Sequence, residues 1–225
     1  MASEIKQGTL ELVNHLPILQ VITPMLIAPI LVVLNNKTLS WLLSFLGALA
    51  CLFISILLMQ TVSDGSILTY YLGGWVPPIG IEYRIDAANA ILLFLISIIS
   101  AIVLIFSYSS LHAEIPEEKH TLFYSCFLLC LTGLLGVVAT ADIFNVFVFL
   151  EISSLSTYVL VAQGSYLDRR ALSASFNYLI MGTIGATFFV IGIGYIYMAT
   201  GSLNMMDIAE RVSQIGDNRT IQAGF

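Results

Sequence analysis

Long apolar segments separated by short, charged connectors dominate this chain of 225 residues. At a rise of about 1.5 Å per residue, a helix of roughly 20 residues crosses the hydrocarbon core of a bilayer. Six segments reach this length: residues 16–34, 39–60, 87–108, 121–139, 143–162 and 171–199. Strand-like alternation is absent, so helices are the spanning structure that satisfies every backbone polar group. The sequence predicts an all-α integral membrane protein with six transmembrane helices.

Composition agrees with a membrane location and gives no support to nucleic-acid binding. Hydrophobic residues make up 58% of the chain and charged residues only 10%, compared with roughly 25% charged residues in soluble domains. The net charge is −6 and no polybasic stretch is present, so neither nucleic-acid phosphates nor anionic lipids find a basic patch. We expect the lipid bilayer to be a partner, and nucleic acid not to be one.

The cysteines and the glycine pattern give no sign of a cofactor. All three cysteines fall inside apolar runs, where a thiol behaves as a small hydrophobic group. No glycine-rich phosphate loop follows a strand, and no cysteine set has the spacing of a cluster or a metal site. We therefore expect no cofactor and no metal centre.

The chain divides into four parts by its pattern of apolar and polar residues. Residues 1–15 form a charged head, and residues 16–108 hold the first three transmembrane helices with an aromatic, interfacial loop at 61–86. Residues 121–199 hold helices four to six, in which Gly182, Gly185, Gly192 and Gly194 are expected at packing faces. Residues 200–225 predict an amphipathic surface helix, capped by Asn204, and a tail.

Basic residues in the connectors indicate an orientation. Lys37, Lys119, Arg169 and Arg170 lie on one side of the predicted spans, and Arg169 and Arg170 are adjacent in a short loop. The positive-inside rule places that loop in the cytoplasm and the N-terminus outside. We expect a multi-pass protein of the cell membrane.

Glu151 is the feature that most directly indicates a function. It is the one charged residue of segment 143–162 and lies near its middle. An ionised carboxylate at that depth costs roughly 2.5 kcal/mol or more, so such groups usually carry protons or ions. No Lys, Arg or His lies at comparable depth in the six segments. A proton or cation pathway is favoured, and a neutral glutamate hydrogen-bonded to a neighbouring helix is the alternative.

Three stretches of the sequence resemble the proton-antiporter-like membrane subunits. They are TADIFNVFVFLE at 140–151 with the following residues to 158, LTYYLGGWVPPIG at 68–80 with Asp86, and ATGSLNM at 199–205. This family is shared by Mrp-type cation/proton antiporters, membrane-bound hydrogenases and NADH:quinone oxidoreductase (complex I). The likeness is strongest to the D-type member of the Mrp antiporters, and the stretches keep the family's order and spacing.

The resemblance implies the N-terminal part of a bundle of about fourteen helices with two inverted repeats, a familiar plan in transporters. It implies that Glu151 is a proton-relay acid that pairs with a lysine on the seventh helix. Asp142 and Asn145 match the family pattern as supporting groups at the mouth of the helix. Asn177 stands where many relatives have a buried lysine, so proton transfer there would need water or another route.

The resemblance also leaves several functions open. The chain ends at Phe225, where the seventh helix is expected, so the partner lysine and the second repeat would come from a longer or separate chain. The first hypothesis is a proton or coupled Na⁺/H⁺ translocation subunit that works with other membrane subunits. The alternatives are a truncated structural subunit, or a membrane subunit of a hydrogenase or complex I, an enzyme whose chemistry lies in other chains.

Overall fold

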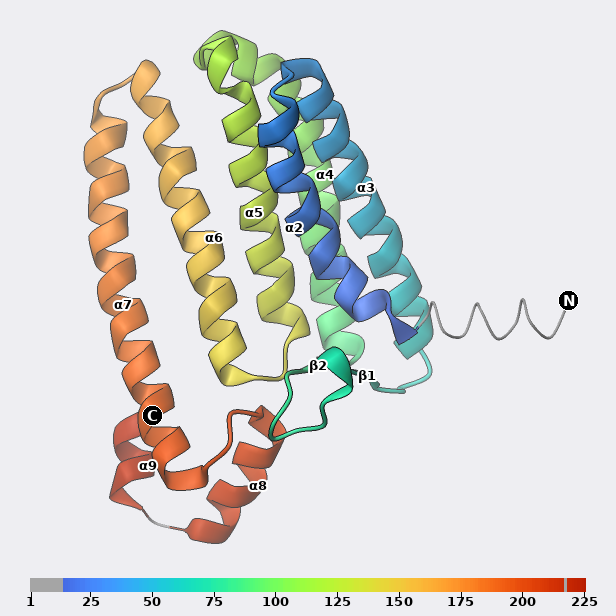
Figure 1. The fold of residues 1–225 in the computed structure, drawn as a ribbon, viewed down its shortest axis with the longest axis vertical. Helices are drawn as coiled ribbons and strands as arrows, with labels where there is room; N and C mark the ends of the chain where they lie inside the picture. The colour runs from blue at the N-terminus through green and yellow to red at the C-terminus, as the bar shows by residue number, and fades with distance from the viewer. Residues whose placement is uncertain (1–13, 217) are drawn as a thin grey trace, which may run out of the picture.

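The computed structural model describes residues 14–216 and 218–225 as a bundle of long helices (Figure 1). Most of the predicted head lies outside these residues. In the described part of the chain, six helices are long and apolar enough to cross a membrane. They are α2 (Leu16–Leu34), α3 (Lys37–Val62), α4 (Ala87–Glu114), α5 (His120–Ala139), α6 (Ile143–Gln163) and α7 (Arg170–Thr200). The prediction of six transmembrane helices is therefore confirmed.

The remaining elements lie at the two ends of the bundle. The single-turn 3₁₀ helices η2 (Glu117–Lys119) and η3 (Gly164–Tyr166) join long helices at one end. At the other end lie the strands β1 (Leu68–Tyr71) and β2 (Glu82–Ile85), the 3₁₀ turn η1 (Leu72–Gly74), and the helices α8 (Met205–Ile215) and α9 (Arg219–Gly224). The strands pair antiparallel, with Leu68 opposite Ile85. The interfacial loop expected at 61–86 contains this hairpin, whose strands are only four residues long.

Helices α2 to α5 form a closed four-helix scaffold. Its core is aliphatic, with Leu58, Leu93 and Leu128 fully buried. Polar contacts join its helices: for example, Gln20 Nε2 donates to Ser97 Oγ at 3.1 Å, and Ser125 Oγ donates to the Ala28 carbonyl at 2.9 Å. Because apolar lipid does not drive helices together, such hydrogen bonds and close packing are what join membrane helices.

Pro24 interrupts the backbone of α2, and a neighbouring helix compensates for it. Proline has no N–H, so the carbonyl of Gln20, four residues earlier, loses its helical donor. The Cys51 thiol of α3 lies 3.7 Å from that carbonyl and donates to it. Neighbouring groups commonly satisfy freed backbone groups in this way in membrane bundles.

Two glycines bring α6 close against the scaffold. A methyl group at Gly133 of α5 would lie 2.6 Å from both the Phe149 carbonyl oxygen and the Ser153 Cβ. A methyl group at Gly136 would overlap the Phe149 ring. The two glycines thus form the shallow surface on which α6 packs. Helix α7 is outermost, next to α6 (Figure 1).

Three extended segments, far apart in the sequence, meet at the end of the bundle that carries the hairpin. Isolated bridges pair Tyr83 with Thr140 and Asp142 with Asn204. The Ala141 N–H donates to the Glu82 carbonyl at 2.9 Å, and the Met205 N–H donates to the Ala141 carbonyl at 2.8 Å. We call residues 82–85, 140–142 and 202–205 the three-segment junction. It joins parts of two of the stretches that carried the family resemblance to residues 82–85, which lie between Gly80 and Asp86 of the third.

Candidate functional site

Glu151 lines a groove between α6 and α7. It is partly buried and lies nine residues after Asp142, about 13 Å along the helix, near the middle of the span. The groove has a volume of about 270 Å³. Its walls are formed by Phe147, Leu150, Glu151 and Ser154 of α6 and by Gly182, Gly185, Ala186 and Phe189 of α7. The side of α7 that faces Glu151 therefore carries small residues, and these leave space beside the carboxyl group.

Glu151 has no hydrogen bond or ion pair to any residue in the described part of the chain. Ser154 lines the groove one turn away and offers a hydroxyl group. A carboxyl group without a charged partner near the middle of a span is a candidate site for binding a proton or a cation.

Contacts between α6 and α7 are strongest on the far side of the groove from the junction. Ser175 Oγ donates to the Tyr158 carbonyl at 2.8 Å, and the Tyr158 and Tyr178 rings meet edge to face at 4.9 Å. A methyl group at Gly182 would overlap the Tyr158 hydroxyl. These contacts close one end of the groove and position α7 beside Glu151.

Asp142 and Asn145 lie at the start of α6 and do not line this groove. Asp142 precedes the first residue of the helix, with an extended backbone. Asp142 caps the helix by accepting the Asn145 N–H at 2.7 Å, and Asn145 Nδ2 donates to Thr140 Oγ1 at 3.0 Å. Burial raises the pKa of Asp142. The two side chains hold the first turn of α6 in place.

Asn177 is separate from the other predicted residues. It is exposed on α7 and does not line the groove beside Glu151. The structure thus pairs Asp142 with Asn145 and places Glu151 and Asn177 apart from them. A role for Asn177 in a buried polar axis remains a prediction.

The junction contains a buried acid that sequence reasoning missed. Glu82 is 6% exposed, and its Oε2 accepts a hydrogen bond from Asn204 Nδ2 at 2.7 Å. Asn204 also caps α8, as predicted, by accepting the N–H groups of Met206 and Asp207. The adjacent Tyr83 is buried, which raises its pKa to about 12. No local signal could reveal a contact between residues 122 positions apart.

Metal binding finds no support among the described residues, where no group of three or more His, Cys, Asp or Glu side chains could hold an ion.

Comparison with known proteins identifies the group of membrane subunits to which the chain is related. Residues 140–225 match the transmembrane family described as NADH:quinone oxidoreductase/Mrp antiporter. The chain is 39% identical over 210 residues to the N-type subunit of the NADH-quinone oxidoreductase of Desulforudis audaxviator, covering 92% of this chain and 41% of the relative. It is 31% identical over 209 residues to the D-type subunit of the Na⁺/H⁺ antiporter of Bacillus subtilis, with the same two coverages.

Solved structures agree with these relatives. A chain of the membrane-bound sulfane sulfur reductase, an archaeal respiratory membrane complex, superposes with a TM-score of 0.85 at 33% identity, covering 92% of this chain and 42% of that one. A chain of the Mrp complex from Dietzia sp. superposes with a TM-score of 0.76 at 20% identity, over 95% and 40%, and shares the fold. This chain spans about two fifths of the length of its relatives. The predicted resemblance is confirmed.

Proposed function

Residues 140–225 belong to the NADH:quinone oxidoreductase/Mrp antiporter transmembrane family, and from this premise we propose that the chain is the N-terminal part of a proton-translocating membrane subunit. The observation that carries the proposal is Glu151, an acid near the middle of a span that lines a groove and has no partner among the described residues. Acids at such depth are usually functional.

Glu151 acts as a proton relay in this proposal. A proton reaching the groove binds the carboxylate and gives the neutral acid. When a lysine ammonium on an adjoining helix approaches, the carboxyl releases its proton and forms an ion pair. The lysine comes from a longer form of the chain or from another subunit. Asp142 and Asn145 support the relay by fixing the start of α6.

The moved ion is a proton, alone or exchanged for Na⁺, and the subunit works beside other membrane subunits. Na⁺/H⁺ exchange is named in the relative from Bacillus subtilis, and quinone-linked redox chemistry in the relative from Desulforudis audaxviator. In a redox-driven complex the chemistry would lie in other chains. The subunit lies in the cell membrane with its N-terminus outside and the loop of Arg169 and Arg170 in the cytoplasm.

The test is proton transport by the assembled complex in proteoliposomes, followed with a pH-sensitive dye. Glu151→Gln keeps the size of the side chain but cannot ionise, so transport should fall by about tenfold or more while assembly stays normal. The matched control is Glu118→Gln, which changes an exposed glutamate in a connector and should leave transport unchanged. Full transport by Glu151→Gln would refute the relay.

A structural subunit without transport is the second candidate. The observation in its favour is the same lack of a cationic partner for Glu151 among the described residues. Under that hypothesis Glu151→Gln changes nothing, whereas substitutions at the glycine contacts of α5 reduce the yield of assembled complex. The two variants therefore separate the candidates.

A further inference from the structure

The connector between α3 and α4 carries an apolar tip beyond its hairpin. Trp75, Val76 and Ile79 are 64%, 62% and 82% exposed, and we call residues 75–79 the apolar tip. The chain has no Asp, Glu, Lys or Arg from Gly65 to Ile81. An exposed turn in water normally carries polar residues, so this combination calls for an apolar neighbour.

The tip is folded so that its apolar side chains cannot turn inward. The Leu72 N–H donates to the Ile81 carbonyl at 3.0 Å and closes the turn. Gly73 and Gly74 have positive φ angles of 65° and 75°, which side chains rarely allow. A methyl group at Gly80 would lie 2.5 Å from the Trp75 Cβ. The chain therefore closes tightly on itself, with Trp75 and Ile79 directed outward.

The base of the hairpin is fixed to the bundle, so the tip cannot retreat into it. Tyr83 and Ile85 of β2 are 2% and 0% exposed. The Glu82 carbonyl and the Tyr83 bridge connect β2 to residues 140–142. One side of the hairpin is thus part of the junction, while the tip projects from it.

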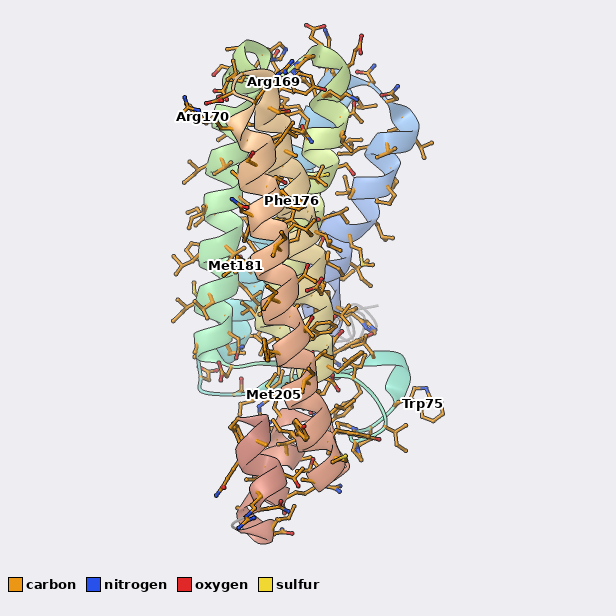
Figure 2. The ribbon with its side chains drawn as sticks, turned by 90° about the vertical axis from the view of Figure 1, so that its left-hand side faces the viewer. Trp75, Arg169, Arg170, Phe176, Met181 and Met205 are labelled. Atoms are coloured by element: carbon orange, nitrogen blue, oxygen red, sulfur yellow. The ribbon has the colours of Figure 1, made fainter. Side chains whose placement is uncertain are left out.

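The tip lies at the level of a membrane surface. Helix α7 has 31 residues and is about 46 Å long, close to the roughly 40–45 Å of a bilayer with its headgroups. Its two ends therefore mark the two headgroup layers. Figure 2 shows Trp75 near the level of Met205, at the end of the bundle opposite Arg169 and Arg170. The indole points away from the helices.

We propose that the apolar tip inserts into the boundary between headgroups and acyl chains and anchors this end of the bundle to lipid. The indole suits this layer, because its ring is apolar and its N–H can donate to headgroup oxygens. In the described part of the chain that N–H has no acceptor. Since the tip has no cation, it binds neutral phospholipid as well as anionic phospholipid. The surface adjoins the lipid-facing sides of the spans and does not depend on Glu151.

The test uses Trp75 as a fluorescent reporter in the full-length protein, with every other tryptophan replaced by phenylalanine. Vesicles contain phosphatidylcholine brominated near the headgroup or deep in the chain, with or without phosphatidylglycerol. We expect shallow bromines to quench about half of the emission, deep bromines less, and aqueous acrylamide little. Phosphatidylglycerol should make no difference.

A matched control keeps Trp41 and replaces Trp75 instead. Trp41 is partly buried at the other end of the bundle, where its Nε1 donates to the Leu104 carbonyl at 2.9 Å, so shallow bromines should quench it less than Trp75. A spin label at Ile79→Cys gives a second measurement that leaves both tryptophans in place. It should collide with oxygen more than with an aqueous nickel chelate.

Two results would overturn the proposal. One is quenching of Trp75 by acrylamide without quenching by lipid, which would place the tip in water. The other is loss of lipid quenching when the whole complex is assembled, which would show that another protein chain covers the tip. Both are independent of proton transport, so they do not depend on the role of Glu151.

Discussion

The α2–α5 scaffold and the α6–α7 pair are built from similarly apolar helices, yet only the scaffold is closed. Within the most apolar 18 residues of each span, 56% are buried in the span that contains α5 and 11% in α7. In the scaffold, hydrogen bonds join polar groups of different helices, as between Gln20 Nε2 and Ser97 Oγ. The α6–α7 pair leaves Glu151 unpaired, among the described residues, beside a groove. Apolar character alone inserts a helix, whereas small residues and paired polar groups decide which helices close together.

Substitution of the α5 glycines should cause the largest loss of stability, because these glycines hold α6 against the scaffold. Gly133→Leu places a side chain against the backbone of α6 at Phe149 and Ser153. Because overpacking there displaces a helix, unfolding should be easier by about 3 kcal/mol or more, with loss of assembled protein. The measurement is thermal unfolding in detergent. Gly185→Ala is the control, since a methyl group there meets nothing within 4 Å; equal losses from both would contradict the account.

Substitution of Asn204 in the three-segment junction should reduce stability nearly as much as Gly133→Leu. Asn204→Asp keeps an oxygen that can cap α8 but removes the donor to Glu82, and it places two carboxyl groups together. Leaving a buried acid without its donor should reduce stability by about 2 kcal/mol. Glu82→Gln in the same chain restores an amide donor and should recover most of the loss. Failure of that rescue would show that the hydrogen bond is not the stabilising contact.

The start of α6 gives a smaller effect. Asp142→Ala removes the acceptor for the Asn145 N–H and should cost about 1 kcal/mol, whereas Asp142→Asn keeps a cap. Both can be followed by thermal unfolding. If Asp142→Asn abolishes transport while stability stays normal, then Asp142 carries protons and is more than a helix cap.

The ion pair between Lys37 and Glu117, at the Arg169 end of the bundle, should have the smallest effect on stability. The ammonium of Lys37, and to a lesser extent His112 and His120, lowers the pKa of Glu117. A lowered folded-state pKa means that the pair's contribution is present above the ordinary glutamate pKa of about 4.3 and is lost as the pH falls below it. The pair is exposed, so the shift in melting temperature should be slight and should shrink in salt. Glu117→Gln should abolish this pH dependence; an unchanged acid limb would contradict it.

Sequence predicted the spans and the acid but not the contacts between helices. Length and apolar content suffice to place the six helices, and the depth of Glu151 follows from its position in one of them. The glycines that let α6 pack against α5 are Gly133 and Gly136, which the sequence did not single out. Of the four glycines predicted to pack in α7, Gly182 and Gly192 meet neighbours, whereas Gly185 and Gly194 face open space.

The junction could not be predicted for a physical reason. Asp142 and Asn204 could be singled out as a supporting group and a helix cap, but Glu82 reads as an ordinary polar residue in a connector. A hydrogen bond between Glu82 and Asn204, 122 positions apart, leaves no local periodicity. Glu82 and Asp142 stabilise the junction because they are buried there, and their burial depends on where the helices end in space. The groove beside Glu151 likewise arises from the small residues of a different helix.

The most direct test of the central claim is to observe the protonation of Glu151 itself. Infrared difference spectra of the assembled complex, recorded while a pH gradient is imposed and with isotope-labelled glutamate, report the carbonyl band of a protonated carboxyl. We predict a band that changes with pH, is absent in Glu151→Gln and is retained in Glu118→Gln. A transporting complex in which Glu151→Gln leaves every glutamate band unchanged would contradict the claim that Glu151 takes up and releases protons.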